Sequence, residues 1–166
     1  MRYLVDAYNL LFRTRKKKGP LEKYRQTFIE ELNEIISKLN LQVILVFDGA
    51  EEQLRLPSRG HFDALEIIYT PRGQSADEYI FEEAAAAKSS SQLTIVSNDR
   101  ELTGRCRQHH AKSLTIDEFL HFLSKKKAKK KRLSTSHTKT FLDSDPEIAR
   151  LLKIFEKRMF EEEDTF

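Results

Sequence analysis

Short runs of apolar, mostly β-branched residues alternate along the chain with longer stretches in which apolar residues recur every three or four positions. The first pattern is typical of buried strands and the second of amphipathic helices. Strands that alternate with helices favour a mostly parallel sheet with helices on both of its faces. The sequence therefore predicts an α/β protein with three layers, in which helices cover both sides of a central sheet.

The expected strands are the most apolar of these runs, at Tyr3–Val5, Val43–Phe47, Leu65–Tyr69, Leu93–Val96 and, more weakly, Ala111–Leu114. Helices are expected where the helical period or a helix start is clearest, at Leu21–Leu39, at Ala76–Lys88 and from Thr115 onward. The first of these follows Pro20, a residue that suits the start of a helix because its φ angle is already helical.

Length and charge predict one domain followed by a basic segment. A chain of 166 residues can bury one core and carry an appendage. The net charge is +3, but the run Lys125–Arg132 alone carries +7, whereas residues 1–124 hold 17 basic and 18 acidic residues. We expect a domain at 1–124, a basic linker or arm at 125–144, and an amphipathic C-terminal helix at 145–166 that docks on the domain.

Composition excludes several classes of protein. No apolar run approaches the roughly 20 residues needed to cross a bilayer. The first residues do not resemble a signal peptide, because Asp6 interrupts the apolar part and the basic run follows it. The single cysteine, Cys106, cannot form an internal disulfide. These features predict a cytoplasmic protein without a membrane partner.

Three of the expected strands end at an aspartate: Asp6, Asp48 and, after Ser97-Asn98, Asp99. The carboxyl ends of parallel strands meet at one edge of a sheet, and ligands bind there. A fourth aspartate, Asp77, falls in the first turn of the helix that follows the Leu65–Tyr69 strand. Each residue alone could serve only as a helix cap or as a partner of the helix dipole. Four of them at one edge predict an acidic site.

The chemistry of this site follows from its charge. Carboxylates that lie close together raise one another's pKa unless a cation lies among them. Without cysteine ligands or a histidine cluster, the carboxylates select Mg²⁺ or Mn²⁺ rather than zinc. Such an ion, next to basic segments that favour a polyanion partner, suits the hydrolysis of phosphate esters. The chain has no glycine-rich phosphate loop, so nucleoside triphosphate hydrolysis is not expected, and no organic cofactor is predicted.

Four segments together resemble the NYN domain of the bacterial YacP-like group, within the PIN-like nuclease superfamily. They are "VDAYNLL" at Val5–Leu11, "LVFDGA" at Leu45–Ala50, "YTPRGQSADEYI" at Tyr69–Ile80 and "IVSNDREL" at Ile95–Leu102. The C-terminal "LDSDPEIARLL" also matches that group, so the resemblance covers nearly the whole chain. It implies a compact α/β/α domain of the PIN-like type with metal-dependent endoribonuclease activity, and action on translated messenger RNA at the ribosome.

Matching residue by residue, the resemblance implies that Asp6, Asn9, Asp77 and Asp99 are catalytic and that Asp48 is a further metal ligand. Two positions depart from the family pattern. Ala7 stands where a glycine is common, and Asn98 stands where a serine or threonine is often found. Neither departure removes a carboxylate.

The leading hypothesis is a Mg²⁺- or Mn²⁺-dependent endoribonuclease that cleaves single-stranded RNA. In this hypothesis Asn9 positions a phosphate or a metal-bound water. The residues expected to contact RNA are basic: Arg13, Arg15, Lys16, Lys17, Lys18, Arg100, Lys125, Lys126, Lys127, Lys129, Lys130, Lys131 and Arg132. Two alternatives are a catalytically silent module that binds RNA or the ribosome, and a phosphatase that acts on a small substrate.

Overall fold

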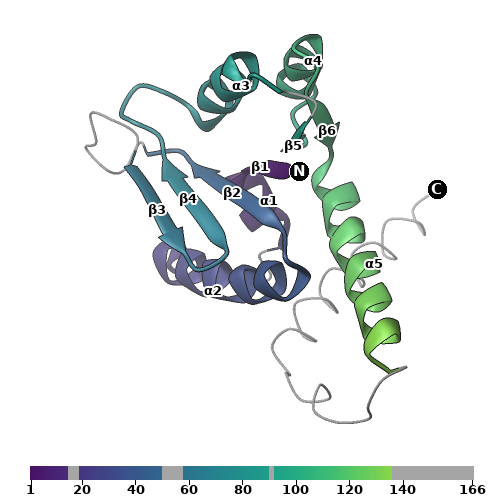
Figure 1. The fold of residues 1–166 in the computed structure, drawn as a ribbon. Helices are drawn as coiled ribbons and strands as arrows, with labels where there is room; N and C mark the ends of the chain where they lie inside the picture. The colour runs from purple at the N-terminus through teal and green to yellow at the C-terminus, as the bar shows by residue number, and fades with distance from the viewer. Residues whose placement is uncertain (15–18, 50–57, 90–91, 136–166) are drawn as a thin grey trace, which may run out of the picture.

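A computed structural model describes residues 1–14, 19–49, 58–89 and 92–135 of the protein. These residues contain six strands and five helices (Figure 1). In chain order the elements are β1 (Arg2–Asp6), α1 (Ala7–Thr14), α2 (Leu21–Leu39), β2 (Gln42–Phe47), β3 (Ser58–Phe62), β4 (Leu65–Tyr69), α3 (Ala76–Ala86), β5 (Leu93–Val96), α4 (Arg100–Gln108), β6 (Lys112–Leu114) and α5 (Ile116–Thr135).

The strands form one sheet in the order β3-β4-β2-β1-β5-β6. Every neighbouring pair is parallel except β3 and β4, which are antiparallel. After β1 the chain builds β2 and β4 on one side, and it later adds β5 and β6 on the other side. The order in which strands are added to the sheet thus reverses at β1. Such a reversal creates a crevice at the carboxyl ends of the central strands.

Helices cover both faces of the sheet, as predicted. Side chains alternate between the faces of a strand, and in β1 Tyr3 and Val5 pack beneath α1, α2 and α5, whereas Leu4 packs beneath α3 and α4. Figure 1 shows α2 and α3 on opposite sides of the sheet. Among the described residues, no helix combines the length and the apolar character needed to span a bilayer.

The five predicted strands and the three predicted helices are all present. The Leu21–Leu39 helix starts and ends as expected, and the next predicted helix stops at Ala86 rather than Lys88. The last one starts in a reciprocal cap, in which the backbone N–H of Glu118 donates to Thr115 Oγ1 and the backbone N–H of Thr115 donates to the Glu118 carboxylate.

Three elements, α1, α4 and β3, were not predicted. Helix α4 begins directly after Asp99, which caps it. Helix α1 begins directly after the last residue of β1, so no polar linker marks its start. Strand β3 has the sequence SRGHF, which lacks the apolar character of the other strands. It is an edge strand that pairs with β4 across a turn in which Asp63 adopts a positive φ of 51°. Pairing with β4, rather than burial of apolar side chains, therefore defines β3.

The expectation of a linker from Lys125 onward is wrong for residues 125–135, because α5 continues through them to Thr135. Alanine and lysine have high helix propensity, and no proline or glycine interrupts the run. The extension also contacts the domain. The Lys130 ammonium donates a hydrogen bond to the backbone carbonyl of Lys38 in α2, and within α5 the Lys126 ammonium lies 5.6 Å from the centre of the Phe122 ring. The predicted C-terminal helix at 145–166 lies outside the described residues.

Candidate active site

Aspartates converge at the carboxyl edge of the sheet. Asp6, Asp48 and Asp77 line one cavity of about 480 Å³. Asp99 lies close enough for its charge to act on both Asp6 and Asp77. The fold therefore brings together the four aspartates that the sequence predicts, from four separate segments of the chain.

Asp6 ends the central strand β1, and it is only 6% exposed. Its carboxylate accepts a hydrogen bond from the backbone N–H of Asn9 at 3.2 Å and another from the Asn9 side-chain amide. Burial raises the pKa of Asp6, the hydrogen bonds from Asn9 lower it, and the charge of Asp99 raises it again, with a raised pKa as the result. Asn9 thus holds the Asp6 carboxylate in place within the first turn of α1.

Asp99 is the N-cap of α4. Its Oδ1 accepts hydrogen bonds from the backbone N–H groups of Glu101 at 2.8 Å and Leu102 at 3.1 Å. The backbone N–H of Asp99 in turn donates to the hydroxyl of buried Ser97 at 3.1 Å. The capping role is therefore real, and it also fixes the orientation of the carboxylate beside Asp6 and Asp77.

Asp77 is the least satisfied of the four aspartates. It follows Ser75, which caps α3 in a reciprocal box with Glu78. Its Oδ1 is buried and has no hydrogen-bond partner among the described residues. The pKa of Asp77 is raised to about 6, first by burial, then by the charges of Asp6 and Asp99, by a hydrogen bond to Asp99 and by the charge of Asp48. That hydrogen bond requires a proton on one of the two carboxyls, so it favours the protonated form.

Asp48 follows β2 and is positioned by the residue after it. The backbone N–H of Gly49 donates to Thr70 Oγ1 at 3.0 Å, and Thr70 is fully buried at the end of β4. A Cβ atom at position 49 would lie 1.8 Å from the Thr70 carbonyl oxygen. Only glycine permits this approach of the two backbones, which places Asp48 on the wall of the cavity.

The donor set fits a hard divalent cation. It consists of carboxylates, and it contains an uncompensated oxygen on Asp77 together with mutual repulsion that a cation would relieve. In the described residues, no three His, Cys, Asp or Glu side chains already form a complete ligand cluster. The aspartates would therefore have to close around an ion by adjusting their side chains.

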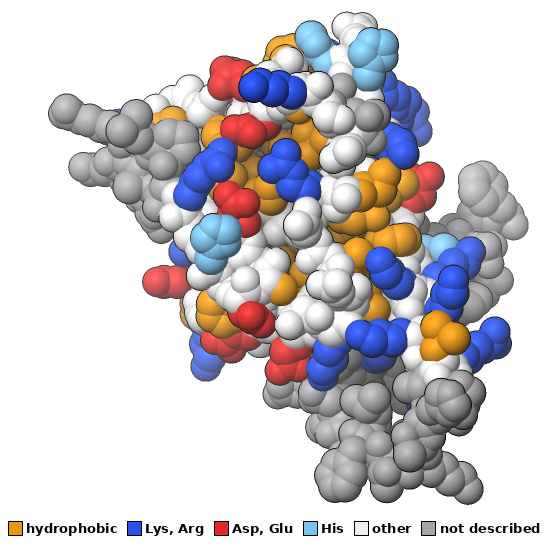
Figure 2. All heavy atoms as spheres, viewed as in Figure 1, with side chains coloured by type: hydrophobic (Ala, Val, Ile, Leu, Met, Phe, Trp, Pro, Cys, Tyr) orange, Lys and Arg blue, Asp and Glu red, His pale blue; other side chains and the backbone are white. Residues whose placement is uncertain are grey.

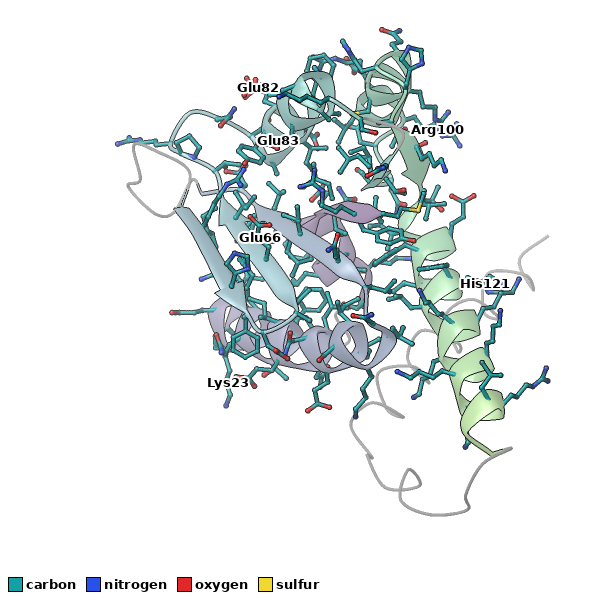
Figure 3. All side chains as sticks on the ribbon, viewed as in Figure 1. Lys23, Glu66, Glu82, Glu83, Arg100 and His121 are labelled. Carbon is teal, nitrogen blue, oxygen red and sulfur yellow. The ribbon has the colours of Figure 1, made fainter. Side chains whose placement is uncertain are left out.

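The described residues among those predicted to bind RNA lie at different places relative to this site. Arg13 lines the cavity, and its guanidinium donates to both oxygens of Asp117 in α5 at 3.0 and 3.2 Å. Arg100 is exposed at the start of α4, and it lines a neighbouring polar depression (Figure 3). The basic run Lys125–Arg132 lies on α5, where basic side chains gather on the surface in Figure 2. Arg15, Lys16, Lys17 and Lys18 lie outside the described residues.

The sequence analysis did not assign Tyr8, Phe12, Ser75 or Ala76 to the site, although all four line the cavity. Tyr8 and Phe12 are four positions apart in α1, so their side chains share one helix face. That spacing becomes informative only once the segment after Asp6 is known to be helical.

Comparisons with known proteins agree with this architecture. The family profile described as the YacP-like NYN domain matches residues 3–160. The fold is similar to that of a crystal structure of Rae1 (YacP) from Bacillus subtilis, with a TM-score of 0.56, 22% identity and coverage of 99% of this chain and 98% of the other. A crystal structure of a mutant form of that Bacillus subtilis protein gives a TM-score of 0.61, 21% identity and coverage of 98% and 97%. No curated protein sequence gave a match.

Proposed function

The chain belongs to the family of YacP-like NYN domains, and from this membership together with its acidic site we propose that it is a metal-dependent endoribonuclease that hydrolyses single-stranded RNA. The family is nuclease-like, which supports a ribonuclease-type enzyme at a coarse level. One observation carries the finer proposal. The buried Oδ1 of Asp77 has no partner among the described residues, and it lies among three further aspartates.

We assign the metal ligands to Asp6, Asp77 and Asp99, with Asp48 as a fourth carboxylate. When bound there, Mg²⁺ or Mn²⁺ would lower the pKa of a water molecule and stabilise negative charge on the departing oxygen. Asn9 acts on Asp6, because its two hydrogen bonds favour the ionised carboxylate at a buried position. The backbone N–H groups that open α4 donate to Asp99 Oδ1 and hold that carboxylate in place.

Basic residues supply the affinity for RNA in this proposal. The cavity is acidic, so without metal it repels phosphate, and attraction must come from its surroundings. Arg100 and the exposed lysines of α5 provide positive charge on the same molecule. The substrate in this proposal is messenger RNA that is being translated at the ribosome.

The test is cleavage of a long unstructured RNA by the full chain, with Mg²⁺, Mn²⁺ or EDTA, and with or without ribosomes. Internal cuts are expected only with metal. D77N and D99N keep the side-chain shape but remove a charge, so cleavage should fall by orders of magnitude. The matched control is D63N. Asp63 lies in the turn between β3 and β4, and its positive φ suits asparagine.

Two other outcomes would contradict the proposal. If the protein binds RNA tightly but leaves it uncut with or without metal, and D77N behaves like the wild type, the chain is a silent binding module. If it hydrolyses a small phosphate ester and is indifferent to RNA, the same carboxylates serve a phosphatase.

A further inference from the structure

An aromatic side chain is exposed at the mouth of the acidic cavity. Phe12, on α1, is 52% exposed and lines the cavity together with Asp6 and Asp77. An exposed phenylalanine gains little for folding, because its hydrophobic stabilisation depends on the area removed from water. Its position in a cavity lined by Asp6, Asp48 and Asp77 suggests a different use.

A series of contacts between aromatic rings connects Phe12 to the core. The Phe12 and Tyr8 rings are stacked, with centres 5.5 Å apart and planes at 18°. Tyr8 contacts Phe47 edge to face at 5.2 Å, and Phe47, which is fully buried, stacks on Tyr69 at 5.3 Å. The Arg25 guanidinium also donates to the Tyr8 hydroxyl at 3.5 Å. The orientation of the Phe12 ring is therefore set by contacts that reach the centre of the domain.

The charge of the cavity explains why such a ring is useful there. Carboxylates repel the phosphates of RNA, so electrostatics cannot hold a nucleotide at the site before a cation is present. A nucleobase is uncharged, and it stacks on aromatic side chains whatever its identity. Only an unpaired base presents its face in this way.

We propose that Phe12, backed by Tyr8, is the stacking platform for one unpaired base of the RNA next to the bond that is cut. This inference rests on the proposed function and adds a binding residue to it. Removing a base-stacking ring costs about 1–3 kcal/mol, which corresponds to a loss of affinity of about 5- to 150-fold.

The test uses short RNAs that carry the fluorescent base 2-aminopurine at one position, moved stepwise along the strand, with binding to the full chain measured in EDTA. Stacking quenches the fluorescence, so one position should be quenched by the wild type. In F12L, which keeps an apolar side chain but loses the flat ring, that quenching should disappear and affinity should fall by the factor above. F12Y keeps the ring and should retain both.

F62A is the matched control. Phe62 is also exposed, but it pairs with Leu65 at the amino end of β4, on the edge opposite to the aspartates. Thermal denaturation should show F12L and F12Y folded. The inference is overturned if F12L binds and quenches as the wild type does, if F62A has the same effect as F12L, or if the protein binds no RNA. Position-specific quenching without metal-dependent cleavage would leave the stacking site standing and overturn the nuclease proposal alone.

Discussion

At the scale of single residues, three of the four aspartates of the site are each positioned by a different local contact. Asp6 is held by Asn9, Asp99 by the first amides of α4, and Asp48 by the close approach of its neighbour Gly49 to β4. The buried Oδ1 of Asp77 has no hydrogen-bond partner among the described residues. Burial, and then the charges of the neighbouring aspartates, therefore raise the pKa of Asp77 to about 6.

This raised pKa predicts a pH dependence of stability in the metal-free protein. The pKa of Asp77 is about 6 in the folded state, against an ordinary value of 3.8. The folded state thus holds the proton more tightly, so stability is greatest below about pH 4 for this group and is lost as the pH rises through 6. In EDTA, D77N should melt at a higher temperature than the wild type at pH 7.5, and the difference should shrink at pH 4.5.

Melting curves at these two pH values, with D63N as the control, check the prediction. Adding Mg²⁺ or Mn²⁺ at pH 7.5 should raise the melting temperature of the wild type more than that of D77N, because a ligand stabilises the state that binds it. A D77N protein that melts below the wild type at pH 7.5 would show instead that the charge of Asp77 stabilises the start of α3.

At the scale of elements, α5 places the basic run at a distance from the aspartates. The helix starts at Ile116, next to the carboxyl end of β6, and it rises about 1.5 Å per residue. Lys129 therefore lies about 20 Å along the helix from that edge. RNA held at the cavity reaches these lysines only if its strand extends that far.

Neutralising Lys125 and Lys129 should thus weaken binding of long RNA but not of RNA too short to span about 20 Å. Both side chains are exposed. If each contacts one phosphate, K125Q/K129Q should reduce the slope of log affinity against log salt by about 1.4, with the cut site unchanged. The control is K88Q/K112Q, which removes two exposed lysines at the opposite edge of the sheet. If both pairs have an equal effect, or if the slope does not change, the basic run is only a solvated helix face that does not contact RNA.

At the scale of the whole molecule, two cores flank the sheet, and α5 belongs to the larger of them. Phe119 is fully buried in that core, and its ring centre lies 5.4 Å from that of Tyr3 in β1. The ion pair between Arg13 and Asp117 joins α5 to α1 beside the cavity. The helix that carries the basic run is therefore part of the domain, and its docking affects both the core and the rim of the site.

Removing the Phe119 ring should destabilise the entire domain. F119A should lower the free energy of unfolding by about 3–5 kcal/mol, measured by chemical denaturation as one cooperative transition. L133A, on the exposed end of the same helix, should change it by about 0.5 kcal/mol or less. A first transition that involves α5 alone, with the sheet still folded, would mean that the helix is a separable arm.

The layered α/β class, the five apolar strands and the aspartates that follow three of them could all be predicted from the order of the residues. These features are local, since the hydrophobic period and the residue that ends a strand can be read within one segment. The gathering of Asp6, Asp48 and Asp99 at one edge also followed, because parallel strands share the edge at which they end.

The folded structure is needed to know which side chains lack a hydrogen-bond partner, which have a shifted pKa and which are exposed to solvent. Strand β3 is defined by its partner β4, and the position of the basic run depends on contacts of α5 such as that of Lys130 with α2. The unpaired oxygen of Asp77 and the exposed ring of Phe12 depend on burial and on distances between segments far apart in the chain. Packing sets those quantities, because burial and the distances between charges exist only once the segments have come together.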